Sequence, residues 1–142
     1  MGVAAAGLRI NAERAQQLLV ETPFARAWGY RVDSLAPWSA RVRLPFKEEF
    51  VRPGGTLQGA CAMGAADVAF WIALMTVVGE EPLALTIHMS TSFLRGARGD
   101  LVCDAAVLRA GRRIAFGEAR TFDGSGELVA HHSLTYIREE RR

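Results

Sequence analysis

The sequence predicts an α+β protein in which one antiparallel sheet wraps around one long central helix. Two features lead to this class: a nearly uncharged segment from about Leu57 to Val78, and the stretches with strand alternation that follow it. A helix that is apolar all round and a sheet with one apolar face bury each other in two layers. The 142 residues, half of them hydrophobic, fit a single domain at 1–142 with its core at about 25–138.

The chain before the long helix predicts a short helix and a hairpin. Apolar residues at helical spacing run from Asn11, a good cap residue, to about Glu21, so we expect an N-terminal helix at about 11–21 that ends at Thr22-Pro23. The stretch WGYRVDSLAPWSARVRLPF has two alternating runs separated by a Pro-containing turn, which is typical of a hairpin. The polar loop KEEFVRPGG then leads into the long helix.

After Gly79, which closes the long helix, the apolar period becomes that of strands. The stretches LVCDAAVLRA, RIAFGEARTFD and LVAHHSLTYI are joined by turn-forming residues, so we expect them and the strand before them to form an antiparallel meander. One face of that preceding strand is the more apolar one, and it consists of Leu85, Ile87, Met89, Thr91 and Phe93. The outer sheet face is polar and its edges need cover, which predicts a homo-oligomer, a dimer or a dimer of dimers.

Charge, cysteines and hydropathy exclude several classes of protein. The net charge is only +2 and the basic residues are scattered, so we expect no nucleic-acid partner. Cys61 and Cys103 are interpreted as core residues of a reducing compartment, and the N-terminus lacks a convincing secretory signal, so we expect a cytoplasmic protein. The long helix contains several Ala and Gly residues and one Asp, which favours a buried helix over a membrane span, and we expect no membrane partner.

The three histidines predict no metal site. His88 lies on the polar face of its strand and is interpreted as an outer-face or subunit-contact residue. His131 and His132 are adjacent on a strand, so they point to opposite sides, and neither has a carboxylate at useful spacing. We expect neither a metal nor a cofactor.

Asp67 is the one charged residue between Arg52 and Glu80. An ionised carboxylate in an apolar helix costs several kcal/mol unless it is paired, hydrogen-bonded or protonated. Two interpretations follow. Either Asp67 serves a function, or it is structural, lying on a wet stripe of the helix or satisfied by a hydroxyl and backbone N–H groups.

The segment from Arg52 to Asp67, together with LTIHMSTSFLRGARGDL, GRRIAFGEARTF and GELVAHHSLTYI, resembles the hotdog-fold acyl-CoA thioesterases of the phenylacetic-acid-pathway type. The resemblance covers about Ala25 to Ile137. In that family a loop and helix start follow the pattern N-x-x-G-x-x-H-G-G, with a carboxylate nine residues after the His. Here Gly55 matches the first Gly, Gly59 matches the Gly after the His, and Asp67 matches the carboxylate.

Three positions depart from the family pattern: Arg52 replaces the Asn, Gln58 the His and Ala60 the last Gly. Gln58 cannot hold a charge, but its amide can donate to a carbonyl or orient a water. A related group of hotdog thioesterases also resembles this sequence in placing Gln before the Gly.

The resemblance implies a site that hydrolyses a thioester. The leading N–H groups of a helix lack partners and favour an anion, so we assign the Gly59 N–H to polarising the thioester carbonyl, with Gln58 positioning the carbonyl or the water. Asp67 is then the general base or the nucleophile. We expect the loop residues Arg52 and Gly55 to contact substrate.

Three further side chains have both a structural and a substrate-binding interpretation. Trp71 follows Asp67 by one turn and is either a core residue or part of an acyl pocket. Arg95 and Arg98, like Arg112 and Arg113, flank turns and are either solvated or bind the phosphates of coenzyme A.

Helix geometry predicts where the site lies. The nine residues from Gln58 to Asp67 make roughly two and a half turns, which places these two side chains on opposite faces about 13 Å apart along the axis. The site therefore lies between subunits. We expect a homo-oligomer that hydrolyses a medium-chain or aryl acyl-CoA. The alternative is a non-catalytic acyl-CoA-binding or structural hotdog protein, and a hotdog dehydratase is disfavoured because its His-centred segment is absent.

Overall fold

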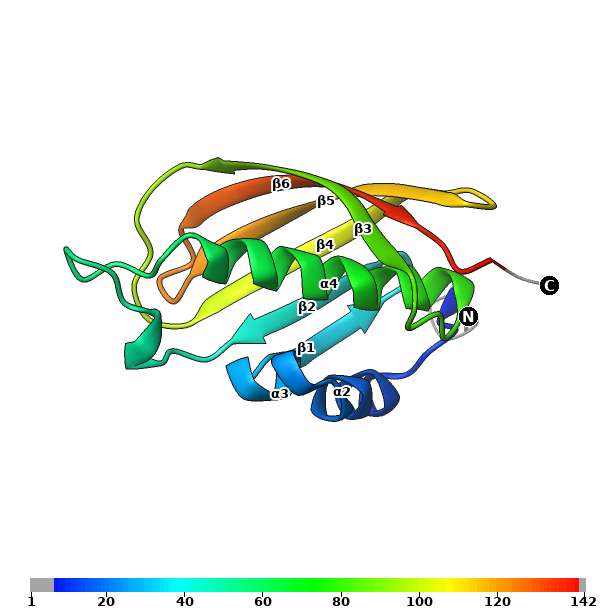
Figure 1. Ribbon diagram of the computed structural model, residues 1–142, viewed down its shortest axis with the longest axis horizontal. Coiled ribbons are helices and arrows are strands. Elements are labelled where there is room, and N and C mark those ends of the chain that lie inside the picture. Colours follow the sequence, from blue (N-terminus) through cyan, green and yellow to red (C-terminus); the bar gives the residue numbers. More distant parts are fainter. Residues whose placement is uncertain (1–6, 141–142) are drawn as a thin grey trace.

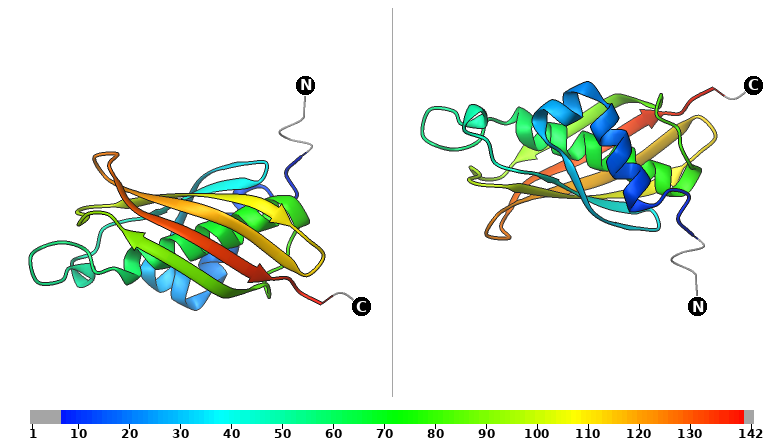
Figure 2. Two further views of the ribbon diagram at one scale, coloured as in Figure 1. Left: turned by 90° about the horizontal axis from the view of Figure 1, so that it is seen from above. Right: turned by 90° about the horizontal axis from the view of Figure 1, so that it is seen from below.

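The computed structural model describes residues 7–140, and its six strands form one antiparallel sheet in the order β1-β2-β4-β5-β6-β3 (Figure 1). The sheet wraps around α4, as the sequence predicts. Helices α2 and α3 lie on the same side of the sheet as α4, near β1 (Figure 2). The elements are α2 (Ala12–Glu21), α3 (Pro23–Trp28), β1 (Arg31–Ala36), β2 (Ser39–Leu44), the 3₁₀ helix η1 (Glu48–Phe50), α4 (Ala60–Val78), β3 (Leu85–Phe93), β4 (Leu101–Ala110), β5 (Ile114–Asp123) and β6 (Leu128–Ile137).

The N-terminal elements differ from the expectation by one added helix. Asn11 caps α2 as predicted, and its side chain accepts a hydrogen bond from the Arg14 N–H at 2.7 Å. The chain then breaks at Thr22 and starts a second helix, α3, because Pro23 is well suited to a first helical turn. The predicted hairpin is present as β1 and β2.

Helix α4 begins at Ala60, three residues later than predicted, because Leu57 forms an isolated bridge with Val51. Gly79 closes it, with a φ of +86° that suits glycine. The helix is long and apolar enough to cross a membrane by length and composition, yet most of its side chains are buried in this protein. Its first three turns leave one strip of helix surface uncovered, and we call this the open stripe. The open stripe consists of Ala60, Met63, Gly64, Asp67 and Trp71.

The predicted four-strand meander is wrong in its first strand. β4, β5 and β6 pair in succession, but β3 pairs with β6 instead of β4, and β2 takes the place beside β4. Seven residues, from 94 to 100, separate β3 from β4. This is longer than a tight hairpin loop, so the chain has room to cross from one edge of the sheet toward its middle.

A bulge in β3 changes which residues face α4. Thr86 pairs with Tyr136 and His88 with Thr135, so Ile87 is an extra residue without a partner. As a result Thr86 lies on the helix side together with Met89, whereas Ile87, predicted to share a face with Met89, is 54% exposed. His88 is exposed on the outer face, in agreement with its interpretation.

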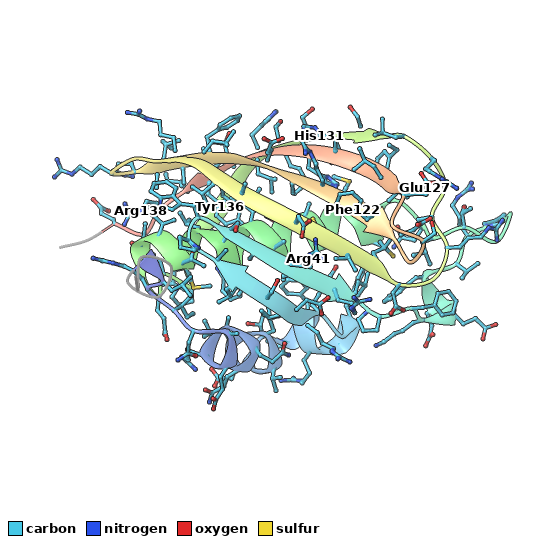
Figure 3. All side chains as sticks on the ribbon, turned by 180° about the vertical axis from the view of Figure 1, so that it is seen from behind. Arg41, Phe122, Glu127, His131, Tyr136 and Arg138 are labelled. Atoms are coloured by element: carbon cyan, nitrogen blue, oxygen red, sulfur yellow. The ribbon has the colours of Figure 1, made fainter. Side chains whose placement is uncertain are left out.

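The remaining core predictions hold. Cys61 and Cys103 are buried and unpaired. His131 lies on the outer face of the sheet, visible from behind the molecule in Figure 3, and His132 is fully buried. The His132 ring nitrogens lie 2.9 Å from the Thr91 hydroxyl and 2.8 Å from the Thr121 hydroxyl.

Burial of His132 predicts a pH-dependent contribution to stability. Burial, with a smaller effect of nearby His131, lowers the pKa of His132 from 6.5 to about 4, so between these pH values the unfolded chain binds a proton that the folded protein does not. The free energy of unfolding should therefore fall as pH falls from 6.5 to 4, by at most about 3 kcal/mol. Urea titrations at several pH values between 6.5 and 4 measure this free energy. In His132→Asn it should no longer show this dependence on pH. The same pH dependence in His132→Asn as in wild type would show that His132 is not its cause.

Gly64 allows α4 to contact the hydroxyl of Tyr30. A Cβ built on Gly64 would lie 2.2 Å from the Tyr30 Oη and 3.4 Å from its ring carbon Cζ. The missing side chain at this position is therefore required by the hydroxyl and not by the ring.

The Gly64 contact predicts that the effect of Gly64→Ala on the free energy of unfolding depends on the Tyr30 hydroxyl. In the wild-type background, Gly64→Ala should lower the free energy of unfolding by about 1–3 kcal/mol, because the methyl group overlaps the Tyr30 hydroxyl. In a Tyr30→Phe background the same change should be neutral, or stabilising by up to about 1 kcal/mol, because alanine is the better helix former. Chemical denaturation of the four proteins measures both values. Equal effects of Gly64→Ala in the two backgrounds would show that the hydroxyl is not the constraint.

Candidate active site

Asp67 lies on the open stripe with one carboxylate oxygen held in place. Its Oδ1 accepts hydrogen bonds from the Thr86 hydroxyl at 2.5 Å and the Tyr136 hydroxyl at 2.7 Å, and the Tyr136 hydroxyl also lies 2.9 Å from the Asp67 main-chain oxygen. Oδ2 accepts no hydrogen bond from any residue between 7 and 140. One oxygen is thus anchored and the other is available to a ligand or water.

Tyr136 is a stable donor to this carboxylate. Burial, followed by the negative charge of Asp67, raises the pKa of the Tyr136 phenol well above its ordinary value, so the phenol keeps its proton. The structural interpretation of Asp67 foresaw a hydroxyl partner, but the sequence did not identify Thr86 or Tyr136. Thr86 faces inward only because of the β3 bulge, and Tyr136 belongs to β6, 69 residues further along the chain than Asp67 (Figure 3).

A cavity of about 300 Å³ lies beside Asp67. Its wall is largely apolar and aromatic, and the Trp71 indole N–H is fixed by a 3.3 Å hydrogen bond to the Pro82 carbonyl. Trp71 therefore lines a pocket, as its substrate-binding interpretation requires. The principal lining residues are Phe24, Val68, Trp71, Pro82, Leu85 and Tyr136.

Gly59 lies at the start of α4 with a backbone N–H that no acceptor in the described chain engages. Gln58 caps the helix, since its side-chain oxygen accepts from the Ala60 N–H at 2.7 Å, and this leaves only its amide nitrogen for a ligand. The ring of Phe93 covers Gly59, and a Cβ at Gly59 would lie 3.0 Å from that ring. A side chain at this position would therefore require the Phe93 ring to shift.

The predicted substrate-binding arginines gather near this end of α4, but each one contacts the protein. Arg98 donates to the carbonyls of Gly55 at 2.9 Å and Gly54 at 3.2 Å, and so holds the loop whose two glycines have positive φ. Arg52 donates to the Pro53 carbonyl within the same loop. Arg95 forms an exposed ion pair with Glu127 at 3.3 Å, so a phosphate would compete with that carboxylate.

Gly59 and Asp67 do not meet within one chain. They lie on one helix eight residues apart, which is about 12 Å along its axis. Across residues 7–140, no three His, Cys, Asp or Glu side chains cluster in a way that would hold a metal ion. The chemistry available to this surface is thus a carboxylate beside an apolar cavity, and a separate helix start with an open N–H.

Comparisons with known proteins agree with this chemistry. The family model of the thioesterase superfamily matches residues 54–130, which include both Gly59 and Asp67. A protein of Sulfurisphaera tokodaii with the name "putative esterase" is 30% identical over 123 residues, or 85% of this chain and 91% of that protein. The chain therefore belongs to the thioesterase superfamily.

Solved structures place the fold in the same group. A structure from Silicibacter sp. TM1040, described as a "putative thioesterase", is 30% identical with a TM-score of 0.83, covering 94% of both chains. The E. coli PaaI protein from the phenylacetic acid degradation operon is 18% identical with a TM-score of 0.80, covering 92% of this chain and 97% of that one, and at this identity it supports the fold alone. The protein is a hotdog-fold member of a family of thioester and ester hydrolases.

Proposed function

We propose that this protein hydrolyses acyl-CoA thioesters, with a medium-chain or aryl acyl group, at a site shared by two copies of the chain. The observation that carries the proposal is the Asp67 carboxylate, anchored through Oδ1 and open at Oδ2, beside an apolar cavity. An aromatic wall suits an acyl group of this kind. The free, buried Cys61 and Cys103 support a cytoplasmic location.

The reaction needs one water and no cofactor. Asp67 Oδ2 takes a proton from the water, and the water oxygen forms a bond to the thioester carbon. The carbonyl oxygen gains negative charge and accepts a hydrogen bond from the Gly59 N–H of the partner. The C–S bond then breaks, sulfur leaves with the electron pair, and it receives the proton from Asp67, which yields the free acid and the thiol of coenzyme A.

The positions of β3 and α4 support a two-fold arrangement that completes the site. In one chain Thr86, near the start of β3, hydrogen-bonds to Asp67, and Phe93, at the end of β3, contacts Gly59. The two ends of β3 therefore lie beside these two positions on α4. The midpoint of the pair on β3 lies between residues 89 and 90, and the midpoint on α4 is residue 63. A two-fold axis near this point exchanges the two ends, and so brings Asp67 of one copy to Gly59 of the other.

The surface near this axis favours contact with a second copy. β3 is an edge strand, and no described strand pairs with its free side. The open stripe beside it includes Ala60, whose small side chain permits a close approach. Exposed apolar side chains line the strand and the residue after it: Leu85 at 64%, Ile87 at 54%, Phe93 at 56% and Leu94 at 55%.

Asp67→Asn should lower kcat for acyl-CoA hydrolysis by at least about a hundredfold, because the amide cannot take the proton from water. Substrate affinity and the melting temperature should stay close to wild type, since the amide oxygen can still accept from Thr86 and Tyr136. Release of free thiol from a panel of aryl and medium-chain acyl-CoA esters measures the effect. A variant with nearly full activity would support the alternative, a protein that binds acyl-CoA or serves a structural role without catalysis.

Complementation tests the shared site. Asp67→Ala and Gly59→Val should each be inactive, the second because its side chain overlaps Phe93 and crowds the N–H. When both are co-expressed, about half of the dimers are mixed, and each mixed dimer has one site with both residues intact, so activity should return to roughly a quarter of wild type. Mass measurement confirms mixing, and melting curves confirm that the parents fold. Recovery no greater than the sum of the parents would show that one subunit supplies the whole site.

A further inference from the structure

Tyr30 is fixed in place by an aromatic cluster directly after α3. Its ring stacks on Trp28 with a centroid distance of 6.2 Å and an interplanar angle of 11°, and it meets Phe24 edge to face at 6.3 Å. The residue is only 2% exposed. The position of its hydroxyl is therefore set by packing and not by solvent.

This hydroxyl lies at the open stripe, beside Gly64. It contacts α4 at Gly64, where even a Cβ would approach within 2.2 Å. The Tyr30 Oη makes no hydrogen bond to the part of the chain that the structure describes. No fully buried polar side-chain atom there lacks a partner, so this oxygen must open onto the stripe surface.

The surroundings keep Tyr30 protonated. Burial is the main cause that raises the pKa of its phenol well above the ordinary value, and the nearby Cys61 and Asp67 add to it. The hydroxyl is thus a neutral donor close enough to Asp67 to be influenced by its charge.

The spacing along α4 fits one water between the two groups. Gly64 and Asp67 are three residues apart on the same helix face, where Cβ positions are about 5–6 Å apart. Two consecutive hydrogen bonds of about 2.8 Å through one water oxygen span a similar distance. Neither Asp67 Oδ2 nor Tyr30 Oη has a hydrogen-bond partner among residues 7–140.

We infer that Tyr30 is a catalytic residue that, together with Asp67, holds the attacking water. The inference rests on the proposed hydrolysis. Asp67 Oδ2 accepts one proton of the water and Tyr30 donates to one of its lone pairs, which leaves the other lone pair to form the bond to the thioester carbon. The proton goes to Asp67 and from there to the departing sulfur, while Tyr30 keeps its own proton. Its hydrogen bond stabilises the hydroxide as it forms.

Tyr30→Phe tests the inference directly. It should lower kcat roughly 10- to 100-fold with KM within about twofold of wild type, because the variant loses a contact to the water and none to the acyl-CoA. Trp28→Phe is the matched control: it trims the same aromatic cluster but keeps the Tyr30 hydroxyl and an aromatic ring beside it, so its kcat should fall less than that of Tyr30→Phe. Melting temperatures of both variants show whether the fold is intact.

Gly64→Ala gives a second test that keeps the tyrosine. Its methyl group must displace the hydroxyl, so kcat should fall as in Tyr30→Phe. The double variant Tyr30→Phe, Gly64→Ala should have the kcat of Tyr30→Phe alone, because both changes remove the same contact.

The outcomes separate this inference from the proposed function. If Asp67→Asn abolishes activity but Tyr30→Phe keeps kcat within about twofold of wild type, the hydrolase assignment stands and the role of Tyr30 is overturned. Multiplicative losses in the double variant would also overturn it, since they would show two independent effects. Wild-type protein that hydrolyses no member of the acyl-CoA panel would overturn both.

Discussion

The stiffness of α4 is the constraint on which the site depends. An α-helix holds its residues at a fixed rise, so Gly59 and Asp67 stay about 12 Å apart whatever the rest of the chain does. The sheet covers most of this helix and leaves the open stripe, which carries the only carboxylate of the helix. A chain built in this way can position each half of a reaction site with precision, but it needs a second helix to join the halves.

Anchoring of Asp67 distinguishes a carboxylate that can act from one that is merely accommodated. If both oxygens accepted protein hydrogen bonds, the group would be satisfied and inert. Here both hydroxyl donors converge on Oδ1, from β3 through Thr86 and from β6 through Tyr136. Two neighbouring strands thus fix the orientation of a side chain on the helix, and no residue in the described part of the chain bonds its other oxygen. The pairing of β3 with β6 is therefore part of the site as well as part of the sheet.

The sequence predicts the layers of the fold and the position of the carboxylate, because both depend on local periodicity. The apolar run that forms α4, the Asn11 cap and the turn residues between β4, β5 and β6 each act within a few residues. The place of β3 in the sheet depends on its pairing with β6, which is distant in the sequence. The periodicity of a strand does not show which other strand it pairs with.

The hydrogen-bond partners of the site residues also could not be predicted from the sequence. A single bulge at Ile87 reverses the facing of Thr86, and alternation alone cannot reveal an extra residue in a strand. Arg98 was a candidate for binding phosphate from its place beside a turn, but it holds the Gly54 and Gly55 carbonyls, which only the folded loop brings near.

The sheet order also sets a sequence of events during synthesis of the chain. β3 ends at Phe93, but β6, with which it pairs, begins only at Leu128. Likewise β2 ends at Leu44, and β4, with which it pairs, begins only at Leu101. As the ribosome works from the N-terminus, the apolar α4 emerges before any strand that will cover it except β1 and β2. Asp67 gains its Tyr136 anchor only when β6 has been made. The nascent chain therefore carries an incompletely covered apolar helix until β4, β5 and β6 have been made, and a truncated product that lacks β6 should be a target for chaperones and proteases and not a slow enzyme.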